Sequence, residues 1–374
     1  MSDSLYVLDK LISFDTTISK NTFEAVYFVK DYLESKQIKT HLVYNNDKTR
    51  ASLLATVGDE NSAGIILSGH LDTVAVIKEE WNTNPHELTE IGTKLFGRGT
   101  SDMKGGIACA LGNIDALKAS GKTFHFSLTH DEEGIFSAIK QLNQNNFDGF
   151  FKQKPLGCIV MEPTLLKPIY GHKGTYLGKI NIIGKESHSA YPYLGVDAMS
   201  YMVKIYNKIM SIMEKFGETS ARDENYNPDK TSFNICTFKS GDAINKIPGF
   251  AEISFCMRYL PQDDIQLIFN EIKNYCSEIE FEMKKQDENC SVSFTEILNV
   301  KGFESDINSE FVKKFPNPTK VSYATEGGYF QEMGINTIVY GPGSIEQAHI
   351  KNEFIEKSQL EAFDKFIQNE LCNF

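Results

Sequence analysis

Four short apolar segments of the chain each end next to a residue type that binds metals, and this pattern constrains the fold most. The segments are Ile65–Asp72, His125–Gly134, Gly157–Thr164 and Asn336–His349. Each apolar run has the length of a buried strand, and ligands of open α/β sheets gather beyond the carboxyl ends of the strands. The pattern therefore predicts a largely parallel sheet with a metal site at one edge.

These segments and the Gly-rich stretch Gly97–Gly106 (GRGTSDMKGG) supply a set of metal-type ligands. The set comprises His70, Asp102, Glu132, Glu133, Glu162 and His349. Two imidazoles and several carboxylates, with no thiolate among them, suit a pair of divalent ions such as zinc, for which cobalt can substitute. A two-metal centre needs a bridging carboxylate, terminal carboxylates, one histidine for each metal and a spare carboxylate as base. The set offers one residue for each role.

The Gly-rich stretch could instead cradle a phosphate, because it precedes a predicted helix over Lys104–Ser120. It lacks the Gly-Lys-Ser/Thr ending of a P-loop, and Asp102 would occupy the place of the anion. We therefore expect Asp102 to bridge two metals. A helix N-cap at Asp102 is the alternative.

The adjacent carboxylates of Asp131, Glu132 and Glu133 follow a predicted strand. Two neighbouring glutamates at a turn cannot face one metal in the same way. We expect Glu133 to bind a metal and Glu132 to carry a proton from the attacking water to the leaving amine. Asp131 is a competing ligand, and a solvated acidic turn is the alternative for the whole run.

The other ligands also follow predicted strands. Glu162 comes directly after a buried-type strand that Pro163 ends, which favours a terminal ligand. His349 lies in a loop with glycine and proline, which can bring the backbone close to the cluster. Asp72 lies two residues after His70, and we expect its carboxylate to accept the second imidazole N–H and to fix the tautomer.

Composition excludes several classes of protein. A length of 374 residues favours two domains. The net charge of −12 argues against a nucleic-acid partner. No apolar run approaches the roughly 18 residues that a membrane helix needs, and the first residues do not resemble a signal peptide. The seven cysteines are scattered, as is typical of reduced core residues, so we expect a cytoplasmic location.

The order of predicted elements indicates an interrupted domain. Residues 1–175 alternate strands and helices, residues 176–296 follow a β-α-β-β-α-β order, and the α/β character returns over residues 297–374. We therefore expect an α/β catalytic domain, 1–175 and 297–374, interrupted by a ferredoxin-like α+β domain. In the predicted strand Ala251–Tyr259, Arg258 lies on the polar face.

Eight motifs spread over nearly the whole chain carry a resemblance to a known family. They are SGHLD, GRGTSDMKGG, DEEG, EPT, HKG, GKESHSAYP, GDAINKIPGFAEISFCMR and GPGSIEQAHIKNEF. The chain resembles the M20-type zinc metallopeptidase family, which includes acetylornithine deacetylase, succinyl-diaminopimelate desuccinylase, carboxypeptidase G and aminoacylase. The resemblance implies a zinc-peptidase-like catalytic domain, an inserted lid and dimerisation domain, and a homodimer.

The resemblance also implies a role for each candidate residue. His70 and Glu162 would hold one zinc, Glu133 and His349 the other, with Asp102 bridging, Glu132 as base and Asp72 supporting His70. A cis peptide is expected at Asp102–Met103. His188 would reach the active site of a neighbouring subunit and polarise the scissile carbonyl, while Asn245 and Arg258 would grip the substrate carboxylate.

Within the family, the stretches YATEGGYFQ and YGPGSIEQAH are most similar to acetylornithine deacetylases, and the Ser-Asp-Ala-Arg pattern of the desuccinylases is absent. This implies hydrolysis of N2-acetyl-L-ornithine to L-ornithine and acetate, a step of arginine biosynthesis. Thr325 and Glu326 would then bind substrate, with Glu326 facing the δ-ammonium group. The alternatives are a hydrolase of another N-acyl amino acid or dipeptide, such as succinyl-diaminopimelate or acetylcitrulline, and a metal-stabilised binding protein without catalysis.

Overall fold

The computed structural model describes residues 3–374, apart from the side chains of Asn146 and Asp148, and divides into two compact units. The first unit extends to Gly171 and includes Phe303–Lys320 and Thr325–Phe374. The second comprises His172–Gly302 and Val321–Ala324. The division expected near residues 176 and 296 lies close to these limits.

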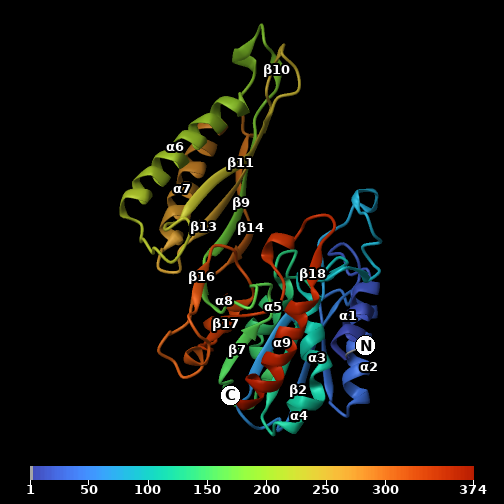
Figure 1. The fold of residues 1–374 in the computed structure, drawn as a ribbon. Coiled ribbons are helices and arrows are strands. Elements are labelled where there is room, and N and C mark those ends of the chain that lie inside the picture. The colour runs from blue at the N-terminus through green and yellow to red at the C-terminus, as the bar shows by residue number, and fades with distance from the viewer. Residues whose placement is uncertain (1–2) are drawn as a thin grey trace. The chain divides into compact units, whose positions relative to one another are not determined.

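The first unit contains a mixed sheet that is parallel at its centre (Figure 1). Its strands are β1 (Thr40–Tyr44), β2 (Ala51–Val57), β3 (Ile65–His70), β6 (Phe124–Thr129), β7 (Gly157–Val160), β8 (Ile169–His172), β15 (Phe303–Glu304), β16 (Thr319–Val321) and β17 (Thr337–Val339). The order is β1-β2-β6-β3-β7-β17-β8-β15, with β16 paired to β8. Strands β6, β3, β7 and β17 are parallel, whereas β1, β2 and β8 join antiparallel. The predicted fold class, α/β with a largely parallel central sheet, is confirmed.

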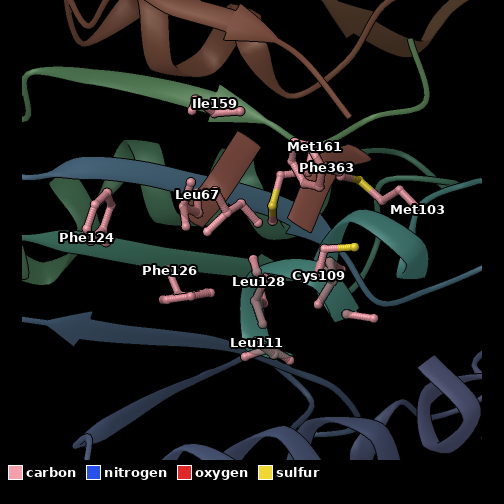
Figure 2. Close-up of a cluster of buried hydrophobic side chains, with 14 of the residues drawn as sticks. Leu67, Met103, Cys109, Leu111, Phe124, Phe126, Leu128, Ile159, Met161 and Phe363 are labelled. Carbon is pink, nitrogen blue, oxygen red and sulfur yellow. The ribbon is translucent and has the colours of Figure 1, made fainter. Parts of the chain in front are cut away.

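The central strands are buried along their whole length. Every residue of β3, β6 and β7 is buried, as parallel strands are when helices cover both faces of a sheet. Figure 2 shows side chains from these strands beside side chains from the covering helices. They include Leu67, Phe126, Leu128, Ile159, Cys109, Leu111 and Phe363. This packing fixes the ends of the strands, and with them the residues that follow.

The first unit contains α-helices in addition to its sheets, and the helix predicted over Lys104–Ser120 is divided. The helices are α1 (Asp3–Ser13), α2 (Phe23–Ser35), α3 (Lys104–Gly112), α4 (Ile114–Ala119), α5 (Ser137–Gln144), α8 (Gly327–Glu332) and α9 (Lys357–Asn369). The prediction of one helix over Lys104–Ser120 is wrong, because the chain leaves the helical conformation at Asn113 (φ −102°, ψ 17°). The Asn113 side-chain amide donates to the carbonyl of Cys109 (2.9 Å) and to Asp364 (2.6 Å). Such local side-chain bonding competes with the helix.

A small sheet completes the first unit beside the Gly-rich stretch. It consists of β18 (Phe354–Glu356), β5 (Lys94–Phe96) and β4 (Thr89–Ile91), all antiparallel. Strand β18 follows the His349 segment and β5 precedes the stretch that contains Asp102. Its pairing therefore joins two ligand-bearing parts of the chain.

The second unit is a four-stranded antiparallel sheet packed against two helices. Its strands are β9 (Gly174–Ile183), β11 (Ser232–Ser240), β13 (Phe250–Tyr259) and β14 (Ser291–Val300), in the order β11-β13-β9-β14. The helices are α6 (Ala198–Thr219) and α7 (Ile265–Lys284), and a short ribbon pairs β10 (Ser187–His188) with β12 (Lys246–Ile247). The chain order is the predicted β-α-β-β-α-β.

Alternation along β13 explains how this sheet packs. Ala251, Ile253, Phe255 and Met257 are at most 2% exposed and belong to the core with α6 and α7, while the residues between them are half-buried. Asp197 and Asp264 accept backbone N–H groups at the starts of the two helices, which are favourable N-caps. Within residues 3–374, no helix has the length and apolar character needed to cross a membrane.

Candidate metal centre

The ends of three parallel strands bring the predicted ligands together in the first unit. His70 is the last residue of β3, Glu133 follows the end of β6, and Glu162 follows the end of β7. Because these strands are parallel neighbours, their carboxyl ends meet at one edge of the sheet. Asp102 lies before α3, and His349 lies in the loop after β17.

Among the described residues, two groups bring possible metal-ligand atoms within 4.8 Å of one another. One consists of His70, Asp102 and Glu162, and the other of Asp102, Glu133 and His349. In the first group, His70 Nε2 lies 3.2 Å from Asp102 Oδ1 and 3.6 Å from Glu162 Oε1. In the second, His349 Nε2 lies 2.7 Å from Glu133 Oε2 and 3.5 Å from Asp102 Oδ2. Asp102 thus offers one oxygen to each group, which is the arrangement of a bridging carboxylate.

The tautomer of His70 is fixed by Asp72, although not through the predicted atom. His70 Nδ1 lies 3.0 Å from the backbone carbonyl oxygen of Asp72 and 3.7 Å from its carboxylate. The Asp72 carboxylate instead accepts the backbone N–H groups of Glu132 (3.2 Å) and Glu133 (3.0 Å). A carbonyl can only accept, so Nδ1 carries the proton and Nε2 is left for a metal. Asp72 therefore orients both His70 and the turn that bears the two glutamates.

The adjacent glutamates point to different places. Glu133 contacts His349, whereas Glu132 Oε2 lies 4.0 Å from His70 Nε2 and belongs to neither ligand group. Asp131 faces elsewhere, because its carboxylate accepts the N–H of Ser137 (3.0 Å) and the Ser137 hydroxyl at the start of α5. Asp131 lies outside both ligand groups, so the competing ligand hypothesis for this residue is not supported.

Burial and mutual repulsion dominate the electrostatics of the carboxylates. Burial raises the pKa of Glu132 and of Glu162 well above the ordinary glutamate value, and neighbouring carboxylates add to it. Burial also raises the pKa of Asp72 to about 6. Burial would raise the pKa of Asp102 as well, but its hydrogen bond to His70 and the charges of both histidines hold that pKa below its usual value.

The histidine of the buried group behaves in the opposite way from an isolated buried imidazole. Burial lowers the pKa of His70, but Asp102, Glu162 and Glu132 outweigh burial and raise it well above its usual value. The cluster without cations therefore retains protons, which divalent ions must displace when they bind.

The donor set fits a pair of divalent metals. Two imidazole nitrogens and three carboxylates converge from the same edge of the sheet, and one carboxylate is shared. Imidazole and carboxylate suit zinc and similar ions, and a spare carboxylate beside the ligands suits hydrolysis. The expected cis peptide at Asp102–Met103 is also present.

Thr325 and Glu326 lie in the first unit but are buried. Thr325 is 0% and Glu326 1% exposed. The Glu326 carboxylate accepts the hydroxyls of Ser68 (2.9 Å) on β3 and Thr129 (2.5 Å) on β6, and burial raises its pKa to about 7. The substrate contacts predicted for these two residues stay predictions, and their burial weighs against them.

His188 and Asn245 lie side by side in the second unit. His188 is exposed on the β10–β12 ribbon, and Ser189 donates to the Asn245 carbonyl (3.0 Å). His188 Nδ1 accepts the N–H of Ala190 (3.1 Å), so in the neutral ring Nε2 carries the proton and can donate. Such a donor suits a carbonyl oxygen that gains negative charge.

Arg258 lies at the other end of the same sheet. It pairs with Thr175, near the first residue of β9, and donates to the Thr175 hydroxyl. The ribbon follows the last residue of β9, Ile183, which is roughly 26 Å further along the strand at about 3.3 Å per residue. Within one chain, Arg258 and Asn245 therefore lie too far apart to grip the same carboxylate, and their predicted contacts with the substrate stay predictions.

Two further residues at the centre were not predicted as part of it. The buried Glu353 and Arg98 form an ion pair of 2.7 Å next to Asp102. Both lie inside quoted motifs, at the second position of GRGTSDMKGG and in the ending of GPGSIEQAHIKNEF. An arginine between two glycines and a glutamate four residues after His349, each inside a motif that carries a predicted ligand, were the available signal.

Comparisons with known proteins agree with this geometry. The sequence model of peptidase family M20/M25/M40 matches residues 66–369. Acetylornithine deacetylase of Aliivibrio fischeri is 32% identical over 327 residues, which cover 84% of this chain and 82% of that protein.

Solved structures share the fold at low sequence identity. The M20 family metallo-carboxypeptidase Sso-CP2 of Sulfolobus solfataricus has a TM-score of 0.77 at 16% identity, covering 100% of this chain and 99% of the other. A dinuclear metal-binding peptidase of the M20 family from Bacillus subtilis has a TM-score of 0.62 at 13% identity, covering 99% and 97%. At such identities the likeness concerns the fold alone.

Proposed function

Because the chain belongs to peptidase family M20/M25/M40 and is therefore a metal-dependent hydrolase, we propose that it deacetylates N2-acetyl-L-ornithine. The observation that carries the chemistry is the pair of ligand groups that share Asp102, with Glu132 beside them and outside both. The relative at 32% identity supports the choice of substrate. The products would be L-ornithine and acetate.

In this proposal, His70 and Glu162 hold one ion, Glu133 and His349 hold the other, and Asp102 bridges. The donor types favour zinc, with cobalt as a working substitute. When bound, the two ions supply Lewis-acid polarisation of the scissile carbonyl and of the attacking water.

Glu132 is the proposed proton carrier. Its carboxylate lies near the ligands without being tied to them, and burial with carboxylate neighbours raises its pKa. A raised pKa brings a carboxylate nearer to neutral pH, where it can both take a proton from water and return it to the amine nitrogen. Bound cations would act against this rise.

The separation of Arg258 from the His188 ribbon supports a homodimer. If both residues act on one small substrate, they must come from two copies of the chain, because one chain holds them at opposite ends of β9. In this arrangement His188 donates Nε2–H to the developing oxyanion, and Arg258 or Asn245 binds the substrate carboxylate.

Complementation tests that arrangement. His188→Ala and Arg258→Ala should each be nearly inactive alone. Co-expressed with different tags, they should recover roughly a quarter of wild-type activity, because half the dimers are mixed and one of their two sites is intact. Mixed dimers that stay inactive would contradict the sharing of sites between copies.

The substrate assay tests the function itself. Initial rates would be measured for N2-acetyl-L-ornithine, N-succinyl-diaminopimelate and acetyl-methionine, before chelation, after chelation and after return of zinc or cobalt. We expect a strong preference for acetylornithine that chelation abolishes and metal restores. Metal-dependent turnover of another substrate would keep the chemistry and replace the substrate. Two bound metals without turnover of any amide would refute the function.

A further inference from the structure

The carboxylate of Glu353 gathers the backbone of the loop that carries Asp102. Glu353 is 0% exposed. One carboxylate oxygen accepts the N–H groups of Ser101 (2.8 Å) and Asp102 (3.0 Å). The other accepts the N–H of Gly99 (2.9 Å) and Nη1 of Arg98 (2.7 Å). Each oxygen therefore receives two donors, and all of them come from residues 98–102.

Arg98 extends this contact to the segment that carries His349. Its Nη2 donates to the carbonyl of Ile350 (3.1 Å), the residue after His349. The N–H of Gly97 donates to the backbone carbonyl of Glu353 (3.1 Å). Two segments that are about 250 residues apart in sequence are thus tied through one buried ion pair and its hydrogen bonds. We call residues Arg98 and Glu353 the loop clamp.

The loop clamp contributes more to the position of His349 than to the positions of His70 and Glu162. His70 and Glu162 follow directly on buried central strands, and the core holds them. The side chain of His349 is 58% exposed, and its backbone has a positive φ of 62° within an irregular loop. Glu353 holds the backbone N–H groups of Ser101 and Asp102, and Arg98 holds the carbonyl of Ile350. These contacts fix the backbone next to Asp102 and next to His349.

A carboxylate is the only common side chain that satisfies this arrangement. All four groups that meet Glu353 are donors, and ionised carboxylates have acceptor sites for all of them. A glutamine of the same shape would turn one N–H-bearing nitrogen toward two donors. The negative charge of Glu353 therefore strengthens hydrogen bonds from the loop of residues 98–102, and the positive charge of Arg98 compensates it.

We propose that Glu353, held by Arg98, is a positioning residue for the metal bound by Asp102, Glu133 and His349. It has little influence on the ligand group of His70, Asp102 and Glu162 beyond the shared aspartate. The inference rests on the two-metal site proposed above, but not on the identity of the substrate.

Cobalt titration of purified apoprotein tests the proposal. Glu353→Gln would be compared with wild type by the affinity of each cobalt equivalent and by the visible absorption spectrum of each step. His70→Ala and His349→Ala identify which step belongs to which group. We expect Glu353→Gln to weaken the equivalent that His349→Ala removes by about 10- to 100-fold, and to leave the other within about threefold. The turnover number should fall at limiting cobalt and recover with excess.

Matched variants separate positioning from general damage. Glu346→Gln changes an exposed glutamate of the same segment and should leave both affinities unchanged. Arg98→Lys keeps the charge but cannot serve Glu353 and Ile350 together as the planar guanidinium does, so it should weaken the same equivalent to a smaller degree.

The outcomes are distinguishable. Folded Glu353→Gln and Arg98→Lys proteins with both affinities and spectra intact would overturn the proposal, as would equal weakening of the two equivalents. Apoproteins of both variants that fail to fold would assign the pair to the stability of the fold and refute the selective role. Wild-type protein that binds fewer than two ions would overturn the two-metal function as well.

Discussion

The two histidines of the proposed metal centre would do the same chemical task, but the structure holds them in opposite ways. His70 ends a central strand, is fully buried, and donates its Nδ1–H to a backbone carbonyl two residues away, which leaves Nε2 free. His349 lies in a loop, and its side chain is more than half exposed. The fold itself therefore positions one half of the centre, while hydrogen bonds between distant segments position the other.

The two histidines therefore differ in how easily each of them can move. A ligand on a buried strand cannot move without disturbing the core. A ligand on an exposed loop can move at lower cost, and solvent and substrate reach it more easily. Asp102 belongs to both groups, but the His70 side keeps two ligands that follow buried strands when the Asp102 loop shifts.

The largest effect is expected from separating the two adjacent glutamates. Glu132→Gln should lower the turnover number by about 10²–10⁴-fold with both metals retained, because Glu132 belongs to neither ligand group. Glu133→Gln should instead lose metal on the His349 side. Metal content and steady-state kinetics of the same preparations provide the measurement. Loss of metal from Glu132→Gln would place it among the ligands and remove the distinction.

Removing each histidine tests the comparison directly. In metal-free protein, His70→Ala should lower the free energy of unfolding by about 3–5 kcal/mol, because it leaves buried Asp102 and Glu162 without their partner. His349→Ala should cost less, about 0.2–1 kcal/mol, because the side chain is 58% exposed and solvent screens its 2.7 Å pair with Glu133. Urea unfolding in the presence of chelator measures both. Similar losses in the two variants would show that the exposed half is as deeply integrated as the buried one.

His125 is a buried histidine without carboxylate partners among the described residues, and its pKa changes in the opposite direction from that of His70 in the cluster. His125 on β6 is 1% exposed, its Nδ1 lies 3.0 Å from the Thr56 hydroxyl, and burial lowers its pKa from 6.5 to about 4. Between pH 6.5 and about pH 4, His125 is protonated in the unfolded chain but stays neutral in the folded chain. Stability should therefore fall as the pH drops from about 6.5 to 4, by up to about 3 kcal/mol from this residue.

Unfolding at several pH values would measure this slope in wild type and in His125→Gln. The variant should lose part of the acid sensitivity, whereas His41→Gln, at an exposed position of β1, should keep it. An unchanged slope in His125→Gln would show that His125 is protonated in the folded protein.

The parts of the centre that could be predicted from sequence depend on where a residue lies relative to its immediate neighbours in the chain. His70 and Glu162 could be recognised as candidate ligands because each directly follows an apolar run, and the ends of parallel strands meet. The predicted division of labour between Glu132 and Glu133 rests on their adjacency and stays a prediction. In both cases the prediction depends only on a few neighbouring residues.

The features that were not predicted from the sequence depend on distant parts of the chain. The acceptor for His70 is the Asp72 backbone, because the turn after β6 takes the Asp72 carboxylate. Arg258 was placed on the correct face of its strand, but its distance from Asn245 depends on where the β10–β12 ribbon joins the sheet. The contact between Glu353 and Arg98 joins residues 255 positions apart, and no local pattern reports such a pairing.

The position of β17 between β7 and β8 affects how the protein is made. Strand β7 ends at residue 160, but its parallel neighbour begins at residue 337. At ribosomal rates of about 5–20 residues per second, roughly 10–35 s pass before that neighbour is synthesised. During this time the nascent sheet has an open hydrophobic edge, which is a typical binding surface for chaperones and a route to aggregation. A chain that stops anywhere before residue 337 retains this edge and lacks His349, whatever the state of its other ligands.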